Sequence, residues 1–477
     1  MLDTVPGLAL RWIVGRDIMT CPSCLKPGEW QHVAATVDPV GGSRLVYLDG
    51  QLLKSESTQS AAESVSRGYE LQRWVNACGG RGGAPIKFNG AIFTVDNAYN
   101  DPDHRNWGGS YWAQNTRLIY WPMLAGGDFD LMQPWFDVYL EALPARKAAT
   151  RAYYGHDGAF YPETFNIWGN YQDESMGYGL DRAGHPDGFV VNPYIRYHWQ
   201  GGIEVVAMMI DYYDLTLDRE FRDKKLLPFA AEIITFYDQH YPRDGGGKIR
   251  MTPAQSLETW WSCVNPMPEV AGLRFIIPRL QQIAGTNLFQ RTLDDLPPVP
   301  VSEDGKRLLP GGEFGDHRNC ERPELYAIFP YRLYGAGKPG LEAALNTIGG
   351  PSGEGCWHQE PIQFALLGKT DWARDNITGR AAATQPGFRF QAFWNQGHDW
   401  MPDQCHGGGL MLALQYMLMQ TDGRKICLFP AWPKDWDVSF KLHAPERTTV
   451  ECVYRGGKVE SLKVTPESRK SDVVLTP

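Results

Sequence analysis

The sequence has no apolar run of about eighteen residues, so it predicts no membrane-spanning helix. No signal peptide precedes the first strands, and we therefore expect an N-terminally truncated fragment. With 46 Lys and Arg against 55 Asp and Glu, the formal net charge is -9. Nucleic acids and anionic membranes attract clustered positive charge, so this balance argues against both and favours neutral or cationic partners.

Cysteine is sparse and poorly patterned. There are nine cysteines, an odd number, so at least one thiol is unpaired. Cys21 and Cys24 form the one C-x-x-C pair, and no second pair follows at the spacing of a zinc ribbon. The glycine-rich stretch 79–83 lacks the Lys-Ser/Thr of a phosphate loop and follows a predicted helix. We expect mostly buried thiols, no metal and no cofactor.

Aromatic residues, in contrast, are abundant. They make up 12% of the 477 residues, with 17 Trp, 22 Tyr and 20 Phe, while a hydrophobic fraction of 43% suffices for a full core in roughly two to four domains. Aromatic rings that stack on the C–H faces of sugars explain this excess, and so do large aromatic cores. An oligosaccharide or polysaccharide partner is one hypothesis that follows.

Residues 1–57 are predicted to form strands. The pattern GEWQHVAATVD followed by LVYLDGQ resembles the closing strands of concanavalin-like (laminin-G-type) jelly rolls, which often bind carbohydrate. A segment of this length cannot supply both sheets of such a sandwich. We therefore predict a partial jelly roll that contributes little to sugar binding, and whose strands pair edge-on with the rest of the chain or stay mobile.

Residues 58–422 carry amphipathic helical patterns joined by long aromatic loops. The clearest candidate helices are residues 61–78, 136–154, 201–218, 228–241, 269–285, 339–348 and 409–420. Repeated helices without intervening strands predict a mainly α fold, an (α/α)6 toroid whose loops converge on one mouth. Strand patterns return in residues 423–477 and predict a C-terminal β-domain.

Two carboxylates stand in unusual surroundings. Glu258 in TPAQSLETWW precedes Trp260 and its neighbour Trp261, and burial beside such rings favours a protonated carboxyl. Asp403 follows Trp400 in the glycine-rich segment DWMPDQCHGGG. Hydrolysis of a glycosidic bond requires one protonated carboxyl to assist the leaving oxygen and one ionised carboxylate to activate water.

Each carboxylate also has a structural interpretation. Glu258 follows Ser256, and a glutamate shortly after a serine is also typical of the first turn of a solvent-exposed helix. Asp403 follows Pro402, and aspartate is common in turns.

Several loops together resemble glycoside hydrolase family 95, the inverting α-L-fucosidases and α-L-galactosidases of the six-hairpin clan, and more closely their uncharacterised relatives. The matching segments are IKFNGAIF at 86, NWGGSYWAQNTRLIYWPML at 106, ETFNIWGN at 163, KIRMTPAQSLE at 248, PDQCHGGGLMLALQYML at 402 and KICLFPAWPKDW at 425. The resemblance implies an inverting exo-glycoside hydrolase that acts on oligosaccharides from plant or algal polysaccharides. It also implies a periplasmic or extracellular location.

The resemblance assigns roles to particular residues. Glu258 occupies the place of the general acid, and Asp403 that of the aspartate that activates water. Asn115 matches the second of two asparagines that orient this water. Ala113 replaces the first, and Gln114 beside it points elsewhere on a helix. We expect a compensating polar side chain, Glu163 or Asn166, or else low activity.

Further candidates for substrate binding share an aromatic or polar side chain in these loops. They are Asn89, Trp112, Glu163, Asn166, Trp168, His198, Trp260, His358, Trp400 and His406. Glu163, Asn166 and Trp168 would grip hydroxyls and stack on a sugar, or else brace their loop. In the segment from His317 to Glu324, Glu321 is an alternative base.

Two other functions remain open. A polysaccharide lyase of the same fold would need a Tyr or His base, for which Tyr111, Tyr194 and His198 are present. It would also need a cation for the uronate, for which Arg117 is present, although an internal salt bridge is the simpler role for Arg117. An inactive carbohydrate-binding protein would be consistent with Ala113. Carboxyls of Glu258 and Asp403 about 6.5–9.5 Å apart would favour the inverting hydrolase.

Overall fold

The structure is a computed structural model. It describes residues 2–14, 17–38, 43–57, 61–93, 105, 107, 110–171, 184–350, 355–383 and 402–476. The chain divides into two compact units, Met1–Arg67 and Gly68–Pro477, and each is described by itself.

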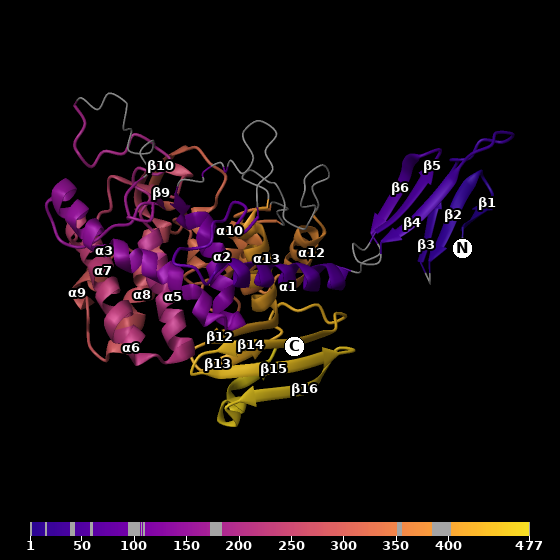
Figure 1. Cartoon of the computed structure of the whole chain (residues 1–477). Coiled ribbons are helices and arrows are strands. Elements are labelled where there is room, and N and C mark those ends of the chain that lie inside the picture. Colours follow the sequence, from indigo (N-terminus) through magenta and orange to yellow (C-terminus); the bar gives the residue numbers. More distant parts are fainter. Residues whose placement is uncertain are drawn as a thin grey trace. The chain divides into compact units, whose positions relative to one another are not determined.

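The first unit contains two antiparallel sheets of three strands each (Figure 1). The strands are β1 (Leu2–Val5), β2 (Ala9–Val14) and β3 (Asp17–Cys21) in one sheet, and β4 (Val33–Asp38), β5 (Ser43–Leu48) and β6 (Gln51–Ser57) in the other. Trp12 and Met19 of the first sheet share a core with Val46 of the second. The expectation that these strands lack a partner sheet is wrong, because the two sheets pack on one shared core.

Helices dominate the second unit. The helices and helical turns of the described residues are α1 (Ala61–Gly79), α2 (Ala113–Gly126), η1 (Phe129–Met132), α3 (Gln133–Tyr154), α5 (Gly201–Thr216), α6 (Arg219–Phe221), η2 (Arg222–Leu226), α7 (Leu227–His240), α8 (Met267–Ala284), α9 (Gln290–Asp295), η3 (Pro323–Ala327), α10 (Leu341–Ile348), α11 (Glu360–Leu366), α12 (Thr370–Ala382) and α13 (Gln404–Leu418). All seven candidate helices are thereby confirmed. The candidates 201–218 and 409–420 each end two residues early, the latter because Met419 already begins a strand.

Contacts among six of these elements run in two series, which a hydrogen bond from the residue before α11 joins. α2 packs on α5, α5 on α8, and α8 on η3. Gln359, which precedes α11, donates to the hydroxyl of Tyr326 in η3 at 3.4 Å. α11 packs on α13, and α13 returns to α2. Of the other helices, α3 packs on α7, α7 on α5, and α12 on α11 and α13.

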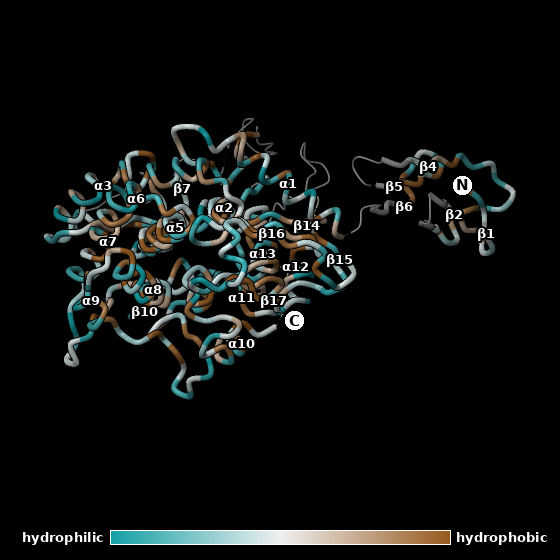
Figure 2. The backbone as a smooth tube through the Cα atoms, turned by 90° about the horizontal axis from the view of Figure 1, so that it is seen from below, coloured by the Kyte–Doolittle hydropathy of each residue, from teal (hydrophilic) through white to brown (hydrophobic). Residues whose placement is uncertain are grey.

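The inner helices are apolar on most of their surface. α5 has the sequence GGIEVVAMMIDYYDLT, and most of its residues are buried. Figure 2 shows the corresponding brown stretch of backbone along α5. A helix that is hydrophobic all round is stable in water only when other elements surround it, which explains its central place.

The second unit also contains strands between the helices, which the sequence patterns did not predict. β9 (Ala254–Ser256), β10 (Trp260–Pro266) and β11 (Gly311–His317) form an antiparallel sheet in the order β11-β10-β9. β7 (Tyr111–Trp112) pairs with β8 (Thr164–Phe165). No central parallel sheet occurs among the described residues.

The last part of the chain forms two small sheets, as the strand patterns predicted. One contains β12 (Met419–Asp422), β13 (Lys425–Leu428) and β17 (Val473–Leu475), and the other β14 (Val438–Ala444), β15 (Thr448–Arg455) and β16 (Lys458–Thr465). Figure 1 shows these strands at one end of the helices and the β9–β10 pair at the other. None of the helices in the described ranges is both long and apolar enough to cross a membrane.

Candidate active site

The first turn of α2 is held by the segment that contains Glu163. Pairing of β7 with β8 aligns the two segments. The amide of Ala113 donates to the carbonyl of Glu163 at 2.9 Å, and the amide of Gln114 donates to Glu163 Oε1 at 2.6 Å. The first amides of a helix have no partner within it, so this carboxyl satisfies one of them. It thereby sets the position of α2 and of the residues that follow.

Asp403 begins α13. Its Oδ1 accepts from the amide of Cys405 at 3.1 Å and from Cys405 Sγ at 2.6 Å, and the side chain is fully buried. Asn89 forms an antiparallel bridge with Asp403, and the amide of Gln404 donates to the carbonyl of Phe88 at 2.8 Å. The structure therefore brings together Asn89 and Asp403, which lie far apart in the sequence.

Asn115 reaches the same place from α2. Its Nδ2 lies 3.8 Å from Cys405 Sγ, and this sulfur is the one that contacts Asp403. α2 and α13 pack so closely that a Cβ on Gly408 would lie 2.2 Å from the carbonyl oxygen of Leu118. The close packing of the two helices places Asn115 and Asp403 beside one thiol.

Glu258 lies in the turn between β9 and β10. The preceding residue, Leu257, has a positive φ of 52°, and Trp261 Nε1 donates to the carbonyl of Glu258 at 3.0 Å. Asn319 Nδ2 donates to Glu258 Oε2 at 2.8 Å, and the residue is 7% exposed. The turn therefore presents a nearly buried carboxyl that an amide holds in one orientation.

The charge of Glu258 acts on the buried carboxyl of Glu163. Burial raises the pKa of Glu163 well above its usual range, and the negative charge of Glu258 adds to this shift. His198 Nε2 lies 3.5 Å from Glu163 Oε2, and burial, reinforced by the charge of Arg117, lowers the pKa of His198 to about 3. Burial thus favours the neutral form of both residues. Among the described residues neither Glu163 Oε2 nor the ring nitrogens of His198 have a hydrogen-bond partner.

A buried ion cluster lies next to these groups. Arg117 pairs with Glu204 at 3.0 Å and with Glu321 at 3.3 Å, and it also donates to the hydroxyl of Tyr326. Gln359 Nε2 donates to Glu321 Oε1 at 2.8 Å. The predicted internal salt bridge of Arg117 is confirmed. Glu321 is held in this cluster, which leaves it poorly placed for the alternative role of base.

His358 belongs to a polar chain that leads to Glu258. Its Nδ1 lies 3.5 Å from Glu360 Oε1, and its Nε2 lies 3.8 Å from Cys320 Sγ. The amide and the thiol of Cys320 both donate to Asn319 Oδ1, at 2.8 and 3.4 Å. Asn319 in turn donates to Glu258.

His406 and Asn166 take bracing roles in the structure. His406 Nδ1 accepts from the amide of Cys356 at 3.2 Å, and its Nε2 donates to the carbonyl of Arg380 at 3.1 Å. Asn166 Oδ1 accepts from the amides of Trp168 and Asn170 at 3.0 and 3.2 Å. Backbone groups thus occupy both ring nitrogens of His406 and the amide oxygen of Asn166, which argues against the predicted sugar contacts at these atoms.

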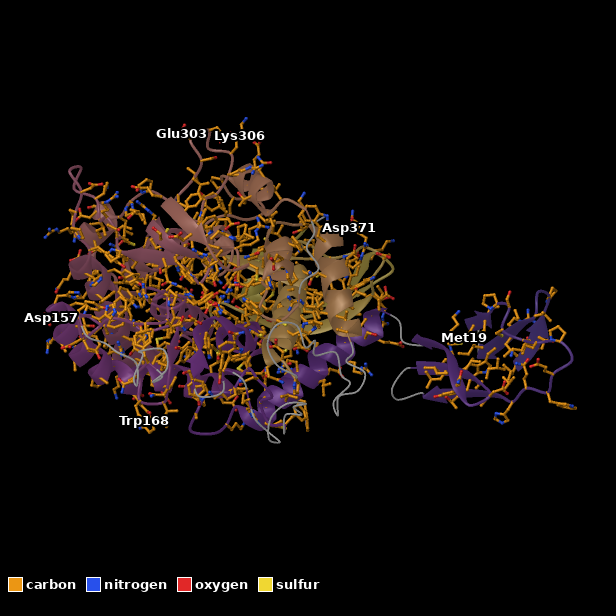
Figure 3. The ribbon with its side chains drawn as sticks, turned by 90° about the horizontal axis from the view of Figure 1, so that it is seen from above. Met19, Asp157, Trp168, Glu303, Lys306 and Asp371 are labelled. Carbon is orange, nitrogen blue, oxygen red and sulfur yellow. The ribbon has the colours of Figure 1, made fainter. Side chains whose placement is uncertain are left out.

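The predicted aromatic contacts differ in their exposure. Trp168 is 69% exposed and projects from the edge of the molecule in Figure 3. Trp112 packs edge-on against Trp107 at 5.4 Å between ring centroids. Trp260 packs against two rings of β11, Phe314 at 4.9 Å and His317 at 4.7 Å. Trp400 lies outside the described residues.

Ala113 faces a helix contact. A Cβ added to Gly201 of α5 would lie 3.1 Å from the Cβ of Ala113 and 3.8 Å from the hydroxyl of Tyr139. The side chain is almost fully buried. Two small residues therefore allow α2 and α5 to approach each other here.

Two residues of the site have no counterpart in the sequence prediction. Cys405 was grouped with the buried thiols, although its place two residues after Asp403 was a signal. Asn319 lies between His317 and Glu321, both considered earlier, and only the register of β10 with β11 brings this segment to Glu258. In the described ranges, no three His, Cys, Asp or Glu side chains form a cluster that could hold a metal ion.

Comparison with known proteins bears on this geometry. Residues 77–288 match the Glycosyl hydrolase family 95 catalytic domain. This match confirms the resemblance seen in the loops at 86, 106, 163 and 248, and it includes Asn89, Asn115, Glu163 and Glu258. It supports a glycoside hydrolase. No curated protein matches the chain.

Solved structures show likeness of fold. A protein from the human microbiome, assigned as a kojibiose phosphorylase, aligns over 83% of this chain at 10% identity with a TM-score of 0.52. This chain spans 58% of the length of that protein. A glycosidase with one Glu-to-Ala substitution aligns over 74% of this chain and 97% of its own, at 12% identity and a TM-score of 0.47.

Proposed function

We propose that this chain is an inverting exo-glycoside hydrolase that acts on oligosaccharides from plant or algal polysaccharides, with a specificity like that of α-L-fucosidases or α-L-galactosidases. The observation that carries the proposal is the contact of Asn115 and Asp403 with one thiol, Cys405. Asn115 lies inside the family match, and Asp403 lies in one of the loops that carry the resemblance. The contacts among α2, α5, α8, α11 and α13 are consistent with the (α/α)6 toroid. A periplasmic or extracellular location belongs to the same proposal.

The proposed reaction uses two carboxyls. Asp403 accepts a proton from water, Asn115 orients that water, and its oxygen attacks the anomeric carbon. The bond to the leaving oxygen breaks, and Glu258 donates its proton to that oxygen. The amide of Asn319 holds the Glu258 carboxyl in place for this step.

Glu163 and His198 are the proposed contacts for sugar hydroxyls. Both are fully buried and carry polar atoms without a hydrogen-bond partner in the described part of the chain. A buried polar atom without a partner is unfavourable, so a hydroxyl or a water molecule that binds there gains free energy. Glu163 is also the better candidate to compensate for Ala113, because Asn166 is engaged in its own turn.

The lyase alternative loses its main support. A lyase needs a free cation to neutralise the uronate carboxylate, whereas Arg117 is 1% exposed and already pairs with Glu204 and Glu321. Taking Arg117 from this cluster would leave two buried carboxylates unpaired, which is strongly unfavourable.

The Glu258→Gln variant tests the role of the acid. We expect it to lose about 100-fold or more in kcat on glycosides with poor leaving groups and much less on activated aryl glycosides, because a good leaving group needs little protonation. Glu303→Gln is the matched control, since Glu303 is an exposed glutamate on a loop at the periphery (Figure 3). Equal losses on both substrate types would reject the assignment of Glu258.

The stereochemical outcome tests the mechanism as a whole. A time course by NMR on a panel of fucosides, galactosides, rhamnosides and arabinosides identifies the sugar and the first-formed anomer. We expect the inverted anomer, because water attacks from the face opposite the leaving group. A retained configuration would overturn the inverting mechanism even where hydrolysis occurs.

A further inference from the structure

A thiol, an imidazole and a carboxylate stand in line beside the proposed acid. Cys320 is exposed, and His358 Nε2 lies 3.8 Å from its sulfur. His358 is 4% exposed, and its other ring nitrogen faces Glu360 Oε1 at 3.5 Å. The proposed hydrolysis uses none of these three side chains.

We propose that Cys320, His358 and Glu360 form a reactive-thiol site, at which soft electrophiles and low-molecular-weight disulfides modify Cys320 and thereby inhibit the hydrolase. The inhibition, though not the reactivity, rests on the proposed function. A nucleophilic thiol requires a cation or a hydrogen-bond donor beside the sulfur, and an approach from solvent. Cys320 has both.

The charge state of His358 agrees with this geometry. Burial opposes a charged ring, but the contacts with Cys320 and Glu360 outweigh it and raise the pKa of His358 to about 10. The same pairing lowers the pKa of Glu360, despite the opposing effect of burial. A protonated His358 donates to Glu360 from Nδ1 and to the sulfur from Nε2, and a charged donor stabilises a thiolate relative to a thiol.

The chemistry is a simple displacement. With an alkyl halide, the sulfur forms a bond to carbon while the carbon–halogen bond breaks, halide leaves, and the thiol proton goes to solvent. With a disulfide, the sulfur forms a mixed disulfide while the S–S bond of the reagent breaks and one thiolate leaves. A reducing thiol reverses the second reaction.

Modification at Cys320 would be transmitted to Glu258 through one residue. Asn319 Oδ1 accepts from the amide and thiol of Cys320, and Asn319 Nδ2 donates to Glu258 Oε2 at 2.8 Å. A group added to the sulfur removes the thiol donor and takes up space beside this side chain. The carboxyl of Glu258 then loses the partner that orients it.

The other cysteines provide internal controls. Cys78 on α1 is the other exposed thiol of the chain. Cys263 and Cys452 are buried, and burial raises the pKa of the Cys452 thiol to about 11. Cys405 is buried against Asp403. Cys24 and Cys427 are partly exposed, so Cys320 and Cys78 are the two cysteines expected to react fastest in the folded protein.

Alkylation rates test the reactive site without any substrate. Full-length protein is treated with limiting iodoacetamide at pH 7, and mass spectrometry follows Cys320 and Cys78 in the same sample. We expect Cys320 to react about 10-fold faster or more, because a charged hydrogen-bond donor, His358, lies beside its sulfur. The variants His358→Gln and Glu360→Gln should each reduce this ratio. Equal rates for the two cysteines in the wild type would overturn the proposal.

Activity measurements test the inhibition. Treatment with oxidised glutathione should lower the hydrolysis of poor-leaving-group glycosides by the wild type at least about 10-fold, reversibly with dithiothreitol, and leave Cys320→Ser at its own starting rate. Fast modification of Cys320 with unchanged hydrolysis would overturn the inhibition. A fast-reacting Cys320 in a protein that hydrolyses no glycoside would reject the proposed function and retain the reactive site.

Discussion

Substitution of Gly408 by alanine should separate α2 from α13. Gly408 lies in α13, and a Cβ at this position would be 2.2 Å from the carbonyl oxygen of Leu118 in α2. Ordinary contact begins near 3.4 Å, so the two backbones would have to move apart by about 1.2 Å. Neither can yield by rotation of a side chain, because the obstacle is a backbone atom in the middle of a buried helix.

The expected loss of stability is about 2 kcal/mol. Overpacking costs about 1–3 kcal/mol, and the upper end applies where backbone must shift. Alanine recovers about 1 kcal/mol of this, because it favours a helix more than glycine does. The same movement would draw Asn115 away from Cys405, now 3.8 Å apart, and a misplacement of this size at a catalytic centre lowers kcat by about 100-fold.

Gly379→Ala is the matched control. Gly379 lies in α12, is exposed, and has no atom within 4 Å of the position of a Cβ. We expect it to stabilise the protein by up to about 1 kcal/mol without any change in kcat. Thermal melting, urea unfolding and kinetics on one glycoside would compare the two variants with the wild type. If Gly408→Ala were as stable and as active as Gly379→Ala, close backbone packing would not be what positions Asn115.

Two further predictions concern buried charges. Arg117→Met should lower the free energy of unfolding, measured in urea, by about 3–5 kcal/mol, because it leaves the buried Glu204 and Glu321 unpaired. Arg81→Met should cost at most about 1 kcal/mol, since the Arg81–Asp130 pair is exposed. Similar losses for the two variants would refute the stabilising role of the ion cluster. Burial raises the pKa of Glu269 well above its usual range. The protonated carboxyl therefore contributes its full share to the free energy of unfolding below a pH of about 4.3, and this contribution is lost as the pH rises toward the folded-state pKa. Glu269→Gln cannot ionise, and its stability relative to the wild type should therefore increase from pH 5 to pH 8; a constant difference would show that Glu269 is not protonated in the folded protein.

Helices that are apolar over long stretches were predictable from the sequence. α5 and α8 carry large apolar residues at three- and four-residue steps, which is sufficient to identify them. α12 was not among the candidates, because two small and two polar residues share its buried face with Ile377. Small side chains contribute little hydropathy although they pack well.

The site was predictable only where local sequence carried the chemistry. Glu258 and Asp403 stood out through their neighbours, while their partners depend on contacts between distant segments. Asn319 contacts Glu258 because of the register of β10 with β11. His406 forms hydrogen bonds with backbone groups of α12 and of the segment before α11, because these two segments meet beside it. Neither contact has a signature in the spacing of residues. The laminin-G-type likeness of the first unit stays a prediction.

The junction of α2 with α13 has a consequence for the synthesis of this protein. Cys405 lies 290 positions after Asn115, so the contact between them forms only after the intervening chain has left the ribosome. At about 5–20 residues per second, this interval is on the order of 15–60 s. During that time α2, which is buried on nearly every side in the finished protein, has no α13 to cover it. The nascent chain therefore exposes an aggregation-prone apolar helix for most of its translation, and we expect its yield in cells to depend on chaperones that shield α2 until α13 arrives.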